Sequence, residues 1–124
     1  MPGQSAQIVG HTVETTEVIH QSGAPSTAVR ISDGEKLFAY SGDTEWTEAL
    51  LPVAAGADLL IIECYGHKGR VPGHLTWEIL KPRVPDLRAR KIMVTHMNAI
   101  MLRHQDEIAA AGLMLAEDGA VLDF

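Results

Sequence analysis

The sequence has a single cysteine among its 124 residues, so no disulfide can form within the chain. A chain without disulfides is typical of the reducing cytoplasm, which is the location that we expect. No basic segment followed by an apolar stretch opens the sequence, and no apolar run is long enough to cross a bilayer. These absences predict a cytoplasmic protein with no membrane partner.

Basic residues are also scarce. Ten lysines and arginines stand against sixteen aspartates and glutamates, and the net charge is −6. Nucleic-acid-binding proteins usually carry a basic face, so the acidic balance argues against a nucleic-acid partner. The hydrophobic content of 46% and the charged content of 21% are ordinary for a globular protein. The length predicts one domain over residues 1–124.

Compact metal-binding motifs are missing as well. The six histidines include no His-x-His and no His-x-x-x-His pair. Any metal site must therefore collect its ligands from segments that are far apart in the sequence.

What the sequence does contain is an alternation of short β-type and helical segments. We expect strands at 7–11, 12–19, 26–32, 36–40, 59–62 and 91–94, with one bent strand over 7–19 as the alternative to the first two. The Asp33-Gly34 pair predicts a hairpin between the third and the fourth of these. We expect a helix capped by Thr44 and closed by Gly56, helices at 75–80 and 99–111, and a final hairpin or strand pair at 113–124. This order predicts an α/β chain with a mixed β-sheet flanked by helices.

Candidate metal ligands follow two of the expected strands. Asp43 comes after the strand at 36–40, and His96 comes after the strand at 91–94. The carboxyl ends of strands are where open α/β sheets place their ligand sites. His20, which precedes a turn at 21–25, is a third candidate, and these residue types suit zinc, manganese or iron. For Asp43, a role as the cap of the following helix is an equally supported alternative.

Glu63 and His74 form a second pair of candidates. Glu63 ends an apolar strand, where a lone carboxylate is costly to bury, and His74 lies at a loop-to-helix junction. Together they could form an acid/base dyad in which the carboxylate orients the imidazole. The alternative is a pair of unrelated exposed side chains. We expect His67, in a glycine-rich loop, to be exposed, and His104 to have a structural role on its helix.

Four motifs, in this order and at similar spacing, resemble the C-terminal half of the metallo-β-lactamase superfamily, above all its RNase Z-like and phosphodiesterase-like branches. The motifs are Gly42-Asp43-Thr44, Asp58 to Glu63, Gly73-His74-Leu75-Thr76 and Thr95-His96. The segment from His20 to Ile31 is similar to the stretch around the family's third histidine. The resemblance covers nearly the whole chain and implies half of an αββα sandwich.

The resemblance also implies roles for single residues. His20 would bind a first metal ion, Asp43 would bridge two ions, and His96 would bind the second. The metal would be zinc, or manganese or iron. His74 and Glu63 would assist proton transfer to the leaving group of a phosphodiester or ester.

The departure from the family is the missing His-x-His-x-Asp-His signature of the N-terminal half. Each metal would receive two ligands from this chain, whereas catalytic zinc usually keeps three protein ligands. We therefore expect weak metal binding or none, and a truncated hydrolase that is inactive or weakly active alone. The chain would be a natural truncated gene, a cassette-type fragment or an excised piece.

Half a sandwich also leaves one face of its sheet uncovered, and such an apolar surface rarely remains exposed to solvent. We expect a homodimer, or a complementing chain, through that face, with an interface of roughly 2,000 Å² or more. One alternative is a non-catalytic dimeric half-domain. Another is a small α/β binding module unrelated to the family, in which Asp43 and His96 would lie more than about 10 Å apart, too far to share a metal.

Overall fold

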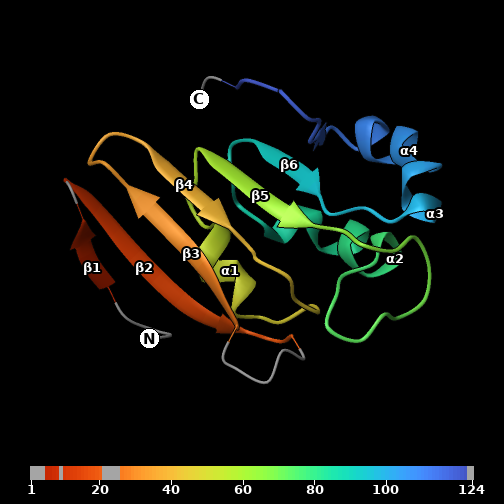
Figure 1. Cartoon of the computed structure of the whole chain (residues 1–124), viewed down its shortest axis with the longest axis horizontal. Coiled ribbons are helices and arrows are strands. Elements are labelled where there is room, and N and C mark those ends of the chain that lie inside the picture. The colour runs from red at the N-terminus through yellow and green to blue at the C-terminus, as the bar shows by residue number, and fades with distance from the viewer. Residues whose placement is uncertain (1–4, 9, 21–25, 123–124) are drawn as a thin grey trace.

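One seven-stranded mixed sheet organises the computed structural model, which describes residues 5–8, 10–20 and 26–122 (Figure 1). The strands lie side by side in the order of the sequence. They are β1 (Ser5–Ile8), β2 (His11–Val18), β3 (Ser26–Ser32), β4 (Leu37–Tyr40), β5 (Leu59–Glu63), β6 (Ile92–Thr95) and β7 (Met114–Leu115). Pairing is antiparallel from β1 to β4 and parallel from β4 to β7, which confirms the mixed sheet.

Five of these strands, β2, β4, β5, β6 and β7, point in the same direction. Both β2 and β4 pair antiparallel with β3, and β5 and β6 continue parallel to β4. The arrows of β2, β4, β5 and β6 accordingly run the same way in Figure 1. The residues that follow these strands therefore meet at one edge of the sheet, which is where chemistry is expected in an open sheet.

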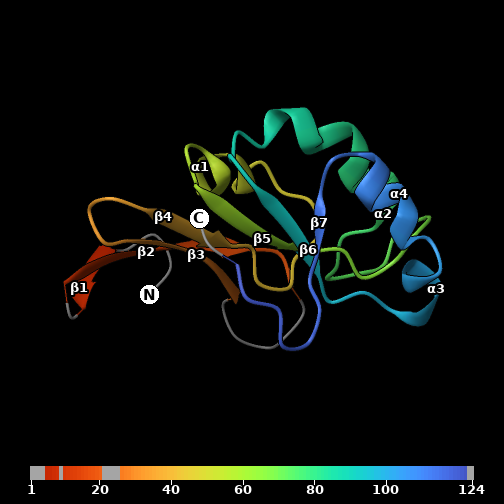
Figure 2. The ribbon, with the colours of Figure 1, turned by 90° about the horizontal axis from the view of Figure 1, so that it is seen from above.

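The helices cover one face of the sheet. They are α1 (Leu50–Ala54), α2 (Trp77–Leu80), α3 (Ala99–Leu102) and α4 (Gln105–Ala110), with a 3-10 helix, η1 (Lys81–Asp86), continuing α2. Figure 2 shows α1, α2 and α4 above the sheet and no described helix beneath β2 to β5. The chain thus forms one sheet layer and one helix layer, which confirms half of a four-layer sandwich. No helix in the described ranges combines the length and apolarity that a bilayer crossing needs.

Alternation along the strands separates the two faces of the sheet, because successive side chains point to opposite sides. The side chains beneath the helices form the core and are almost wholly buried: Ala28, Ala39, Leu60, Ile62 and Val94. Those on the opposite face are apolar but only half-buried: Val29, Ile31, Phe38, Tyr40 and Ile61. The helix-free face, defined by these five residues, is the surface that the expected partner would cover.

Two expected helices differ from the structure. Helix α1 begins at Leu50, with Ala49 as its N-cap, and Thr44 is buried in the irregular segment before it. Its hydroxyl accepts a hydrogen bond from the Ile19 N–H at 3.0 Å, so Thr44 links two loops instead of capping a helix. The helix expected at 99–111 is divided into α3 and α4, and His104 stands at the N-cap of the second.

Two other expectations also need correction. The helix expected at 75–80 begins later, at Trp77, and ends at Leu80 as expected; Pro82 and Pro85 lie in the 3-10 helix η1 that follows it. At the C-terminus, β7 pairs parallel with β6, and no hairpin forms within the described residues up to 122. The turn expected at 21–25 and the end of the last expected strand, at 123–124, lie outside the described residues.

Arg30 joins the sheet to helix α1, and its removal should be costly. Its Nη1 donates to the carbonyl oxygens of Pro52, Val53 and Ala55 at 2.6, 3.0 and 2.8 Å. A cation is favourable at the C-terminal end of a helix, where carbonyl groups lack partners. Arg30→Ala should lower the free energy of unfolding by about 1.5–3 kcal/mol, measured by urea denaturation.

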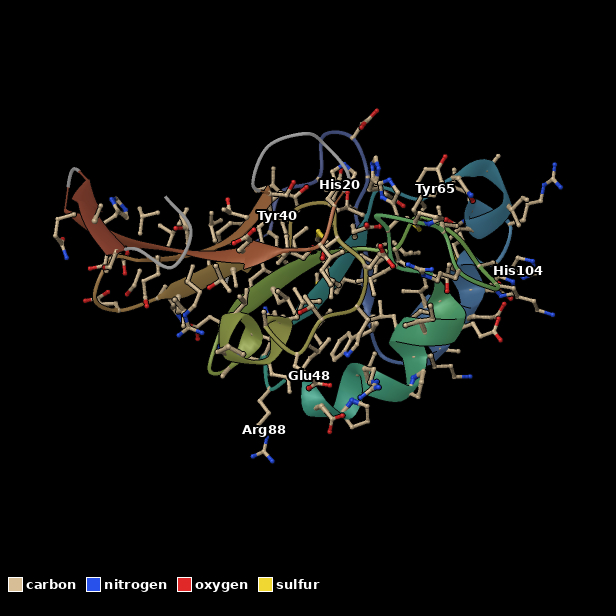
Figure 3. The ribbon with its side chains drawn as sticks, turned by 90° about the horizontal axis from the view of Figure 1, so that it is seen from below. His20, Tyr40, Glu48, Tyr65, Arg88 and His104 are labelled. Atoms are coloured by element: carbon tan, nitrogen blue, oxygen red, sulfur yellow. The ribbon has the colours of Figure 1, made fainter. Side chains whose placement is uncertain are left out.

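Arg88→Ala is the matched control for this prediction, because the Arg88 side chain projects into solvent (Figure 3). That substitution should change stability by no more than about 0.5 kcal/mol. Equal losses in the two variants would show that Arg30 does not stabilise α1.

Candidate metal centre

The predicted site residues converge at the carboxyl edge of the sheet. Ligand atoms of His20, Asp43 and His74 all lie within 4.8 Å of one another. His96 Nε2 is 3.8 Å from Asp43 Oδ1, and His74 Nδ1 is 3.0 Å from Glu63 Oε1. In Figure 3, His20 lies with Tyr65 on the side of the molecule opposite Glu48 and Arg88. The separation of more than about 10 Å expected for an unrelated binding module is therefore wrong.

The His20 imidazole is oriented for metal binding by a backbone contact. Its Nδ1 lies 2.9 Å from the carbonyl oxygen of Gly73, which can only accept, so Nδ1 carries the proton. The lone pair is then on Nε2. A hydrogen bond of this kind behind a ligating histidine fixes both tautomer and ring direction.

Gly42 holds Asp43 at the strand end. Its φ of 62° lies in the left-handed region, and a Cβ at this position would come within 2.8 Å of the Thr27 carbonyl oxygen. Glycine is therefore required for β4 to turn sharply past β3. Because α1 begins at Leu50, Asp43 does not cap a helix, and the alternative role considered for it is wrong.

His96 has an unusual backbone conformation. With φ at 57°, it is the one non-glycine residue with positive φ among the described residues. A bulky residue in this region costs of order 1–3 kcal/mol, and such strain is concentrated at functional sites. The conformation turns the chain at the end of β6, and the imidazole faces Asp43.

Glu63 is fully buried at the end of β5 and is surrounded by hydrogen-bond donors. Its carboxylate accepts from the backbone N–H groups of Thr44, Tyr65 and Leu75, at 3.0, 3.0 and 3.2 Å. Burial raises the pKa of Glu63 to about 7, although these backbone donors oppose the shift. This carboxyl lies 3.0 Å from His74 Nδ1 and can itself take up or release a proton near neutral pH.

The dyad predicted from Glu63 and His74 is therefore present as a contact, and the alternative of two unrelated exposed side chains is wrong. Sequence reasoning missed Tyr65 beside it. The Tyr65 ring stacks on His74 with centroids 4.7 Å apart and lies 5.4 Å from the ring of His96. Tyr65 follows the end of β5 by two residues, and this position at the carboxyl end of a strand could have identified it as a site residue.

Sequence reasoning also missed a second histidine cluster. His67 is not exposed as expected: its side chain is only 10% accessible, and its Nε2 lies 2.8 Å from Glu107 Oε2. His104 Nδ1 lies 2.9 Å from the same oxygen. Because His67 and Glu107 are 40 residues apart, no local pattern could have paired them.

The arrangement of the first site suits a metal ion. The Asp43 carboxylate lies within 4.8 Å of a His20 nitrogen and 3.8 Å from His96 Nε2, and the His20 imidazole has its tautomer set for ligation. The donor set is the mixture of nitrogen and oxygen that zinc, manganese and iron accept.

Comparison with known protein families identifies the superfamily of the chain. A family model described as "Beta-lactamase superfamily domain" matches residues 1–97. The chain belongs to this superfamily. No curated protein sequence matches the chain.

Solved structures of the superfamily share the fold. The chain is similar to the metallo-β-lactamase fold protein YhfI from Bacillus subtilis, with a TM-score of 0.83 and 22% identity over 99% of the chain. The short form of human tRNase Z, ELAC1, gives a TM-score of 0.70 with 20% identity over 95% of the chain. A diphosphatase of the PhnP family gives 0.75 with 22% identity over 100%.

The chain spans about half the length of these superfamily members. It covers 54% of YhfI, 44% of the human tRNase Z and 47% of the diphosphatase. The single helix layer and the helix-free face agree with this coverage, since a complete sandwich has two sheets and two helix layers.

The raised pKa of Glu63 predicts a pH-dependent stability. The pKa of Glu63 is raised from its ordinary value of 4.5 to about 7 by burial. At a pH between these two values, Glu63 keeps its proton in the folded state and has lost it in the unfolded state. The free energy of unfolding should therefore fall as pH rises, by about 2–3 kcal/mol between about pH 5 and pH 8. Urea denaturation across this range measures the slope. Glu63→Gln should remove the part of this pH dependence that comes from Glu63. Equal slopes of the free energy of unfolding against pH in the two proteins would contradict this prediction.

Proposed function

We propose that this chain is the C-terminal half of a metallo-β-lactamase-fold hydrolase that cleaves a phosphodiester or ester when a second half-domain completes it. The main support for the proposal is that His20, His74 and His96 all lie around Asp43 at the carboxyl edge of the sheet: ligand atoms of His20 and His74 are within 4.8 Å of it, and His96 Nε2 is 3.8 Å away. Superfamily membership makes hydrolysis the reaction class to test.

His20 and Asp43 would hold one ion, and Asp43 and His96 a second, with zinc as the first candidate and manganese or iron as alternatives. Such an ion acts as a Lewis acid that polarises the bond to be cleaved. Catalytic zinc usually has three protein ligands, so each ion would lack at least one. The second half-domain would supply the missing ligands.

His74 would provide the proton for the leaving group. Its Nδ1 faces Glu63, so its Nε2 is the atom left for the substrate. The Glu63 carboxylate would stabilise the charged imidazole and hold its ring in place. Stacking on Tyr65 restricts the ring further.

The helix-free face is the surface through which completion would occur. Val29, Ile31, Phe38, Tyr40 and Ile61 are apolar and half-buried, and Tyr40, at the end of β4, lies next to the edge that carries the ligands. A second copy of the chain, or a chain carrying the N-terminal half, would cover this face. A homodimer that buries the face without adding ligands would be non-catalytic, and the two-ligand sites favour this as the second candidate.

Substitution of single residues distinguishes the ligand role from the proton-transfer role. Asp43→Ala should weaken zinc binding more than about tenfold, because Asp43 would contact both ions, and should leave the fold intact. His74→Ala should keep the zinc and lose turnover. Equilibrium dialysis with metal analysis measures the first effect. Loss of zinc in His74→Ala would make His74 a ligand instead.

A charge placed on the helix-free face tests whether a second chain packs against it. Native mass spectrometry should detect an assembly, which for a homodimer has twice the mass of the 13.4 kDa chain. Ile31→Glu should abolish it, because a buried unpaired carboxylate is costly at an apolar interface. Glu35→Lys, in the exposed β3–β4 turn, is the control and should assemble normally.

Hydrolysis is then measured on the assembly with zinc, using bis(4-nitrophenyl) phosphate and 4-nitrophenyl acetate. Turnover that Asp43→Ala abolishes would support the hydrolase. A zinc-free dimer without turnover would support the non-catalytic half-domain. A monomer that binds zinc but neither assembles nor reacts would contradict completion through this face.

A further inference from the structure

A second group of potential metal ligands lies outside the site at the sheet edge. His67 belongs to the loop between β5 and α2, His104 is the N-cap of α4, and Glu107 lies in the first turn of that helix. Ligand atoms of these three residues are all within 4.8 Å of one another. Figure 3 shows His104 well separated from His20, so the two groups cannot share an ion.

The chemistry of this group is that of a three-ligand transition-metal site. Two imidazoles and one carboxylate are a donor set that zinc accepts, with a fourth position left open. His104 and Glu107 are three residues apart on a helical turn, a spacing that places two side chains on one face. His67 adds a donor from a distant segment, which turns a local pair into a chelate.

The geometry requires a small adjustment to admit an ion. The two nitrogens lie 2.8 and 2.9 Å from Glu107 Oε2, whereas ligand atoms around tetrahedral zinc are about 3.3 Å apart, given bonds of about 2.0–2.1 Å. The imidazole rings are stacked, with centroids 3.6 Å apart and planes 3° from parallel. Rotation of the His104 side chain, which is 42% exposed, can open this stack.

Space for a fourth ligand is present beside the two histidines. A surface pocket of about 440 Å³ is lined by both of them, together with Gly66, Lys68, Val71, Asn98 and Ile100. Water or a small anion could therefore reach an ion held at this position, and Lys68 would favour the anion.

We propose that His67, His104 and Glu107 bind a divalent transition-metal ion of the zinc class, separate from the candidate metal centre, which joins the loop carrying His74 to helix α4. His67 and His74 belong to the same connection between β5 and α2. An ion on His67 would fix that loop at a further point, in addition to the Glu63–His74 contact. The alternative is a hydrogen-bonded clamp in which Glu107 accepts from both imidazoles and no metal is bound.

The test is zinc binding in a background that lacks the first site. Asp43→Ala removes a ligand of the candidate metal centre, and isothermal titration with zinc should still find one bound equivalent. Adding His104→Ala should weaken this binding more than about 100-fold, because loss of an outer-shell partner alone costs 10–100-fold. Adding Glu107→Gln, which keeps the shape of the side chain, should also weaken it. His11→Ala, on strand β2, is the control and should not.

A second readout reports the ligand atoms directly. Zinc should shift the ¹⁵N resonances of His67 Nε2 and His104 Nδ1 in the Asp43→Ala protein, and circular dichroism checks that each variant is folded. The proposal is overturned if Asp43→Ala binds no zinc, or if its affinity is unchanged by His104→Ala and Glu107→Gln. The difference in zinc binding between the unsubstituted chain and Asp43→Ala reports on the candidate metal centre. The experiment therefore tests the two sites independently.

Discussion

The buried carboxylate of Glu63 is the contact on which the site depends. It accepts hydrogen bonds from the segment after β4, at Thr44, and from both ends of the following loop, at Tyr65 and Leu75, besides facing His74. A buried carboxylate that loses such partners costs several kcal/mol, so these segments are held together. One side chain thereby sets the position of the loop next to Asp43 and of the His74 imidazole.

The strand directions explain why the remaining groups meet at this point. Because β2, β4 and β6 run the same way, the residues that follow them share one edge of the sheet. The same half-sandwich leaves its helix-free face and its ligand set incomplete on the side where a second half would pack. If the proposed function is correct, metal binding and assembly would therefore depend on each other. The contact of His67 with Glu107 connects the His74 loop to helix α4.

Residue patterns predicted much of this arrangement. The strands at 26–32 and 59–62 and the Asp33-Gly34 hairpin could be predicted because local signals specify them. Residue types alone left the Glu63–His74 contact open against two unrelated side chains, because the two residues lie on different segments. The division of the helix at 99–111 could not, since its apolar spacing continues past the break at His104. The buried position of Thr44 and the pairing of His67 with Glu107 depend on tertiary contacts between distant segments, which periodicity does not encode.

The measurement that tests the account most directly is anomalous diffraction at the zinc edge from crystals of the chain soaked in zinc. The account predicts a peak at the carboxyl edge of the sheet, about 2.0–2.2 Å from His20 Nε2 and an Asp43 oxygen. Ordered side chains at His20, Asp43 and His96 with no zinc among them would contradict the assignment of this edge as a metal centre.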